Sequence, residues 1–326
     1  MHKVHRLAAC LTLLAAGCGD GSQATTDAAT HLADAAGNGG ADGGGADAAG
    51  NQADAALLGS PTWSSEMTSA DGADFYTRHQ PEGAVERGIA DPGADDGLVA
   101  RLRFPGLPAL GNADRVSPEF ASELGTNSET FHYGTYRMRV KLASCAPGEE
   151  VVNGLFTYFN DGTDHDADGI VDNSEIDIEV LCGTPKVAFL SVWTDYSFAT
   201  ETFRKWTRAI DLSNGDIWES PSDHEYGLNK IGNDPSLALP TLLDPGQFVE
   251  LGFEWHADRV RYFARVNGQD KTLAELTDPA RIPSLPAAVL FNVWHSPDHW
   301  FGGGAPPDYP AHDAVQLVDW VKYWKD

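Results

Sequence analysis

The chain has 326 residues, and its hydrophobic fraction of 42% is enough for one large domain or two small ones with a sizeable core. Acidic residues number 48 against 22 Lys and Arg, so the formal net charge is −26 and no basic run offers a nucleic acid a binding surface. Nine Trp favour a neutral ligand instead, since flat aromatic rings cover the apolar faces of sugars without needing charge.

Residues 1–17 predict an export signal. Lys3 and Arg6 precede an apolar stretch that ends in small residues before Cys18 and is too short to span a bilayer. The sequence Leu-Ala-Ala-Gly-Cys that ends at Cys18 resembles the bacterial lipoprotein signal, in which this Cys carries the lipid. We expect an exported protein that is anchored to the outer membrane or the cell surface through Cys18 only. An ordinary cleaved signal, which would give a secreted protein, is the alternative.

Residues 18–60 predict a disordered, lipid-anchored linker. Ala, Gly, Asp and Asn dominate this stretch, and Lys and Arg are absent from it. Such a segment buries too little apolar surface to offset its conformational entropy, and its like charges repel one another. The glycine runs at 37–40 and 43–45 argue against the competing interpretation of one long Ala-rich helix.

Residues 61–326 predict one all-β domain of two packed sheets. Apolar residues alternate over 98–104 and again over 249–255, and the second run leads through a short link to a third before the turn at Asn267-Gly268. The weakly patterned residues 213–244 predict a long insertion over one edge. Cys145 and Cys182 are the only thiols left in this domain, and they predict either a disulfide or two buried free cysteines.

An acidic loop precedes one of the expected strands. Residues 164–175 fit the twelve-residue calcium loop, with acids at positions 1, 3, 5 and 9, Gly at 6 and Glu at 12. Position 12 is Glu175, which cannot both chelate calcium and attack a substrate. A structural calcium would then bind the Ile170 carbonyl and the carboxylates of Asp164, Asp166, Asp168 and Asp172. A solvated acidic turn is the alternative.

The strand expected after this loop carries three acids with a period of two. Glu175, Asp177 and Glu179 point to one face, while Ile176 and Ile178 point to the other. Crowded carboxylates raise at least one pKa, so one acid can remain protonated beside an ionised neighbour. A glycosidase needs this asymmetry, with one carboxylate as nucleophile and another as proton donor. A solvated acidic face is the alternative.

The sequence around this strand resembles glycoside hydrolase family 16, and most closely its lichenase-like members. The matching segments occur in order along most of residues 95 to 326, at 122–126, 133–141, 155–159, 253–260, 291–302 and 319–323. The resemblance implies a β-jelly-roll sandwich of two antiparallel sheets with a concave cleft.

Carried over onto this sequence, the resemblance implies that Glu175 is the nucleophile, that Asp177 orients it, and that Glu179 is the general acid/base. The chemistry would then require no cofactor. The same match gives the candidate sugar-binding residues Tyr158, Arg139, Asn292, Trp294 and Trp300. Trp193, which follows the alternating run 187–192, is a weaker candidate.

Two departures from the family pattern bear on the choice of substrate. Arg137 stands where lichenase-like members carry Glu, and Asn173 stands where many members carry a Trp that packs beneath a sugar. The acid spacing lacks the extra residue of laminarinase-like members, and so favours mixed-linkage glucan or xyloglucan.

We therefore expect a monomeric, retaining, endo-acting glycoside hydrolase whose partner is a polysaccharide, most simply a β-1,3-1,4-glucan. The alternatives are a surface carbohydrate-binding lipoprotein without turnover on the same fold, and a glucan transglycosylase.

Overall fold

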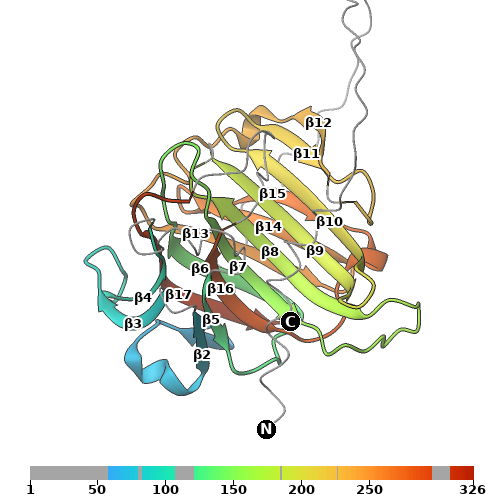
Figure 1. Ribbon diagram of the computed structural model, residues 1–326, viewed down its shortest axis with the longest axis horizontal. Helices are drawn as coiled ribbons and strands as arrows, with labels where there is room; N and C mark the ends of the chain where they lie inside the picture. The colour runs from blue at the N-terminus through green and yellow to red at the C-terminus, as the bar shows by residue number, and fades with distance from the viewer. Residues whose placement is uncertain (1–57, 80–82, 107–120, 184–185, 226, 296–308) are drawn as a thin grey trace, which may run out of the picture.

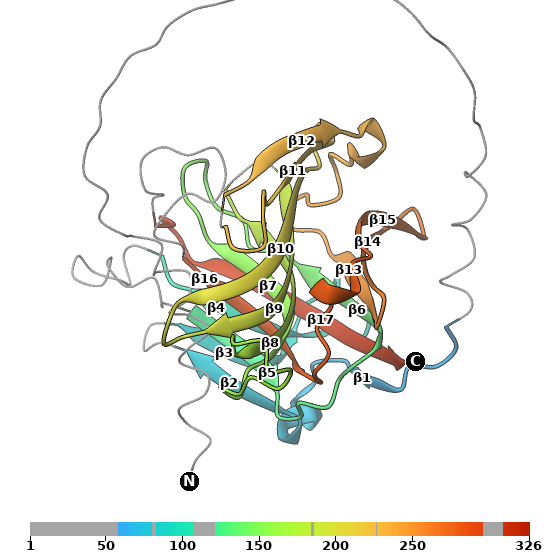
Figure 2. The same ribbon diagram turned by 90° about the vertical axis from the view of Figure 1, so that its right-hand side faces the viewer.

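The computed structural model describes residues 58–79, 83–106, 121–183, 186–225, 227–295 and 309–326. The predicted export signal, Cys18 and nearly all of the predicted linker lie outside the described residues. Within them the chain forms two large sheets that lie face to face (Figures 1 and 2). No helix in these ranges is long and apolar enough to cross a bilayer, since the helices there are short 3-10 turns. They are η1 (Ser69–Ala73), η2 (Pro235–Leu237) and η3 (Pro279–Arg281).

Within the described residues the strands of each sheet pair antiparallel, which confirms the predicted all-β jelly-roll sandwich. The eight-stranded sheet has the order β15-β14-β13-β6-β17-β4-β3, with β1 paired to β17. Its strands are β1 (Trp63–Ser65), β3 (Ala84–Ala90), β4 (Leu98–Phe104), β6 (Gly134–Lys141), β13 (Val249–His256), β14 (Arg259–Val266), β15 (Gln269–Leu276) and β17 (Ala314–Lys325).

The nine-stranded sheet has the order β12-β11-β10-β9-β8-β7-β16-β5-β2. Its strands are β2 (Phe75–His79), β5 (Ala121–Thr126), β7 (Val152–Phe159), β8 (Asp172–Leu181), β9 (Val187–Ser197), β10 (Thr202–Asp211), β11 (Asp216–Glu219), β12 (Asn229–Asn233) and β16 (Ala288–Trp294). The acidic strand is β8, near the middle of this sheet (Figure 1). The concave cleft that the family resemblance implies remains a prediction.

Local sequence patterns explain where several strands begin and end. The alternating runs at 98–104 and 249–255 became β4 and β13, as predicted. Asn267 and Gly268 both have positive φ, at 52° and 78°, and this conformation makes the tight hairpin turn between β14 and β15. The weakly patterned segment 213–244 is more ordered than predicted, because β11 and β12 within it extend the nine-stranded sheet at its edge.

The core lies between the two sheets, and the period of two decides which side chains enter it. Ile176, Ile178 and Val180 of β8 are buried in the same cluster as Met138 and Val140 of β6 in the opposite sheet. The odd-numbered residues of β8 must therefore face away from the core. This places the three acids on the outer face of the nine-stranded sheet.

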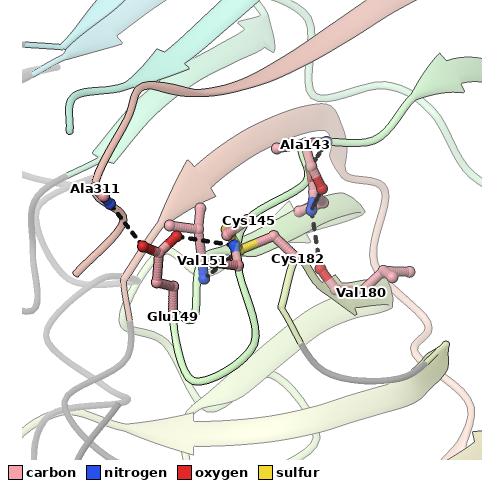
Figure 3. Close-up of a disulfide and its surroundings, with 9 residues drawn as sticks. Ala143, Cys145, Glu149, Val151, Val180, Cys182 and Ala311 are labelled. Atoms are coloured by element: carbon pink, nitrogen blue, oxygen red, sulfur yellow. Dashed lines mark hydrogen bonds between the residues drawn. A yellow bond between two sulfur atoms is a disulfide. The ribbon is translucent and has the colours of Figure 1, made fainter. Parts of the chain in front are cut away.

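A disulfide joins Cys145 to Cys182, with a Cα–Cα distance of 5.2 Å (Figure 3). The structure thus favours the bridge over two free cysteines. Cys145 lies in the loop between β6 and β7, and Cys182 follows the last residue of β8. The amide of Val151 donates to Cys182 Sγ at 3.0 Å. For a sequence separation of 37 between the two cysteines, loop-closure entropy corresponds to about 4 kcal/mol of stabilisation.

Candidate active site

The three acids lie on the outer face of β8, opposite the isoleucines that enter the core. Asp177 is buried, while Glu175 and Glu179 are half-buried. The neighbouring strands surround each acid with a defined pair of residues. Across the sheet, Glu175 lies between Tyr158 and Trp193, Asp177 between Phe156 and Ser191, and Glu179 between Gly154 and Phe189.

Burial and mutual repulsion raise the pKa values of two of these carboxyls. Burial, followed by the charges of Glu175 and Glu179, holds the pKa of Asp177 well above its ordinary range. Burial and the charge of Glu175 raise the pKa of Glu179 to about 8. Glu179 is therefore protonated at neutral pH, which is the state that a general acid needs. A hydrogen bond between Asp177 and Glu175 favours the protonated form of Asp177, so Asp177 donates to Glu175.

Lys205 of β10 is a member of the site that the sequence analysis missed. It is only 8% exposed and lies beside Trp193 in the sheet, with its ammonium group 4.9 Å from the centre of the indole ring. Burial lowers the pKa of Lys205 to about 8, while the charges of Glu179, Asp177 and Glu175 act in the opposite direction. The sequence carried one signal for this residue. By alternation Lys205 shares a strand face with Phe203 and Ala209, and apolar residues on that face indicate that it is not fully exposed to solvent.

Trp193 was a weak candidate in the sequence, and the structure places it next to the acids. It faces Glu175 across the sheet and donates a hydrogen bond to Asp177, which lowers the pKa of that carboxyl against the larger effect of burial. Its ring face lies under Lys205. Trp193 therefore connects the buried cation of Lys205 to the middle carboxyl, Asp177.

Tyr158 and Asn292 lie on the same outer face as the acids, as the resemblance implied. Tyr158 is beside Glu175, whereas Asn292 faces Gly154, which in turn faces Glu179. A Cβ atom at position 154 would lie 2.2 Å from Asn292 Oδ1, so only glycine leaves room for this amide beside Glu179.

Two of the predicted sugar-binding residues, Trp294 and Arg139, need correction. Trp294 is on the acidic face but only 2% exposed, because it packs with Val152, Phe189 and Ala209 and so has no free ring face for a sugar. Arg139 is not a site residue. It belongs to β6 in the other sheet, where it pairs with Asp319 and Asp95.

The departure at Arg137 also does not touch the acids, since this side chain is in β6 and pairs with the buried Asp270. Its charge is therefore paired within the eight-stranded sheet. Trp300 lies outside the described residues. Asn173, the second departure, is at the site and donates to Glu175 Oε2 at 2.8 Å.

The acidic loop brings together three of the four carboxylates that were predicted to bind calcium. One carboxylate oxygen from each of Asp164, Asp166 and Asp172 lies within 4.8 Å of the others. The carboxylate of Asp168 pairs instead with Arg204 of β10, which corrects its assignment as a ligand. Oxygen donors of this kind suit a hard cation such as calcium.

Comparisons with known proteins give one related sequence and several related folds. No family model matches the chain. It is 28% identical over 166 residues to the protein named endo-1,3-1,4-β-glycanase ExoK of Rhizobium meliloti, a match of 50% of this chain and 44% of that protein. The chain thus spans less than half the length of this curated relative.

Two solved structures of similar fold are a Bacillus licheniformis β-glucanase and a LamA variant from Z. galactanivorans in complex with laminaritriose and laminaritetraose. The first has 16% identity and a TM-score of 0.43, over 78% of this chain and 99% of its own. The second has 15% identity and a TM-score of 0.47, over 82% of this chain and 100% of its own.

The buried Lys205 gives a prediction for the protonation of Glu179. Replacing Lys205 with Met removes a positive charge that favours the ionised form, so the pKa of Glu179 should rise further, by about one unit. Carbon-13 NMR titration of protein labelled at the Glu carboxyl carbons measures this, with the Glu179 signal assigned by its loss in Glu179→Gln. Lys230→Met, at an exposed lysine of β12, is the control and should leave the midpoint unchanged. An identical midpoint in Lys205→Met and wild type would contradict the prediction.

Proposed function

We propose that the chain is a retaining, endo-acting glycoside hydrolase that cleaves a β-linked glucan, with β-1,3-1,4-glucan as its substrate. The observation that carries the proposal is the set of three carboxyls on one face of β8, in which Glu179 holds a proton at neutral pH beside an acid that receives hydrogen bonds. This is the division of roles that double displacement requires.

In the first step Glu175 attacks the anomeric carbon while Glu179 gives its proton to the leaving glycosidic oxygen. The carbon–oxygen bond breaks and a covalent glycosyl-enzyme forms. Glu179, now ionised, takes a proton from water, which attacks the same carbon and releases Glu175. The two residues are ~13 Å apart at Cα for four strand steps, and two long side chains that lean together can close this gap.

The related sequence and the family resemblance support the substrate class. The matched relative carries the name endo-1,3-1,4-β-glycanase, and the resemblance to glycoside hydrolase family 16 rests on segments on both sides of the acidic strand. The outer face around the acids is lined by Tyr158, Trp193 and Asn292, which are residue types that contact sugars.

The assignment of the acids predicts a graded loss of turnover. Glu175→Ala and Glu179→Ala should each lower kcat by about 10³-fold or more, and Asp177→Asn should have an intermediate effect. Glu129→Ala is the matched control, because it removes an exposed glutamate in the loop after β5, and it should retain full activity. Rates on lichenan and melting temperatures are measured for all four.

Proton NMR of the first products gives the stereochemical test. Double displacement releases the β anomer first, so an initial α anomer would overturn the assignment of Glu175 as nucleophile. Sizing the products separates the remaining alternatives. Chains longer than the substrate indicate a transglycosylase, whereas binding without any products indicates a carbohydrate-binding protein.

We also propose that the protein is exported and anchored by lipid on Cys18. The support is the signal-like sequence of residues 1–17 and the Ala, Gly and Asp-rich linker that follows. Replacing Cys18 with Ser should move the protein from the membrane fraction to the soluble fraction at unchanged specific activity. Immunoblots of the two fractions measure this, with Cys10→Ser as control. Continued membrane association of the Ser variant would exclude the lipid anchor.

We further propose that the acidic loop binds calcium through Asp164, Asp166 and Asp172. The support is the convergence of their carboxylates, which crowds three like charges that a divalent cation would neutralise. Chelation should therefore lower the melting temperature by several degrees, and added calcium should restore it. Asp166→Asn should imitate chelation, whereas Asp258→Asn, at an exposed hairpin acid, should not. Equal melting temperatures with chelator and with calcium would leave the loop as a solvated turn.

A further inference from the structure

Two amide side chains connect the loop after β7 to the carboxylate of Glu175. Asn160 directly follows β7, and its Nδ2 donates to Asn173 Oδ1 at 3.2 Å. Asn173, in β8, donates in turn from Nδ2 to Glu175 Oε2 at 2.8 Å. Asn160 is 9% exposed and Asn173 is 3% exposed, so bulk water has little access to either amide.

Two backbone groups fix the direction in which every hydrogen bond of this chain runs. The amide N–H of Gly162 donates to Asn160 Oδ1 at 3.0 Å, and the carbonyl of Tyr196 accepts from Asn160 Nδ2 at 3.1 Å. A flipped Asn160 would place carbonyl against carbonyl and N–H against N–H at these two partners. Asn160 must therefore present its NH₂ group to Asn173, which leaves Asn173 only its own NH₂ group to face Glu175.

The chain thus delivers a hydrogen-bond donor to one oxygen of Glu175. A donor favours the ionised form of a carboxylate, and burial makes such a bond stronger than it would be in water. Reversing either amide would leave a buried pair of acceptors in contact, which is the more costly arrangement. The polarity is consequently set by the backbone of the loop after β7, at Gly162, and of strand β9, at Tyr196, and not by Glu175 itself.

We propose that Asn160 and Asn173 are positioning residues that keep Glu175 ionised and aimed along the outer face of β8. This inference rests on the proposed function, in which Glu175 is the nucleophile. The family resemblance places a Trp at position 173 in many members, so Asn173 would serve this chain in a way that those members do not share. The loop that begins at Asn160 would then help to orient the nucleophile through Asn173.

Other groups also act on Glu175, and a test has to separate them from the amides. Asp177 and Glu179 share its strand, and Asp177 forms a side-chain hydrogen bond with it. The titratable and polar groups that face it from other strands are Tyr158 on β7, Trp193 on β9 and Lys205 on β10. Substitutions at Asn160 and Asn173 leave all of these in place.

The experiment compares two substitutions at each asparagine. Asp nearly matches Asn in shape but replaces the NH₂ donor with a second acceptor, whereas Ala removes the whole side chain. If the amides serve only to fill space, Asp is the milder change. If they supply a donor, Asp is the worse change, because it sets an acceptor against Glu175 or against the next amide.

We expect kcat/KM on lichenan to fall about 10-fold in Asn173→Ala and about 100-fold in Asn173→Asp. The acid limb of the pH–rate profile should move to higher pH in both variants, and further in Asn173→Asp, because ionisation of Glu175 loses its donor. At position 160 the Asp variant should again lose more kcat/KM than the Ala variant, but both losses should be smaller than at position 173. KM should change little, since the substrate need not contact either amide.

Asn153→Asp is the matched control. Asn153 is a buried asparagine within β7, but its hydrogen bonds go to the backbone of Ala143 and Val180 and not to an acid of β8. The acid limb of the pH–rate profile of Asn153→Asp should coincide with that of wild type, even if the melting temperature changes. Milder effects of Asp than of Ala at both positions 160 and 173 would overturn the inference while wild-type hydrolysis persists. No wild-type activity on any β-glucan would instead overturn the proposed function.

Discussion

The two-residue period of β8 is the constraint on which the rest of the site depends. Burying Ile176 and Ile178 between the sheets stabilises the fold, and it forces Glu175, Asp177 and Glu179 onto the opposite face together. The same geometry that builds the core therefore creates the electrostatic problem on the outside. Three carboxyls that cannot all ionise in a half-buried environment must divide their protons unequally.

The surrounding strands decide how that division falls. Lys205 of β10 acts on Glu179 through its charge, and Trp193 of β9 donates a hydrogen bond to Asp177. Asn173, in β8 itself, donates to Glu175. Each partner is buried or half-buried, so its effect is weakly screened by water. Burial and repulsion favour the protonated forms of Asp177 and Glu179, and hydrogen-bond donors converge on Glu175. Function in this site would thus depend on the register of five strands as much as on the acids themselves.

The sequence was sufficient for the fold class and for the face that the acids occupy, because both follow from local alternation. It was not sufficient for Lys205 or Asn160, since pairing between β8, β9 and β10 and the path of the loop after β7 are long-range properties. Arg139 shows the converse error. Its spacing matched a family motif, yet β6 belongs to the opposite sheet, where Asp319 pairs with it. Trp294 lies on the expected face of its strand, but neighbouring apolar side chains bury its ring, and this packing cannot be read from the sequence.

The disulfide has a consequence for the accuracy of strand pairing. A shift of β8 by a single residue against its neighbours would exchange its two faces, so that the carboxyls would enter the core and the isoleucines would face outward. Cys182 follows the last residue of β8 and is held 5.2 Å from Cys145, Cα to Cα. A one-residue shift would move Cys182 by ~3.3 Å, so the bridge would have to carry the loop at Cys145 with it or depart from its present geometry. The bridge is therefore a covalent check on alignment, made three residues beyond Glu179.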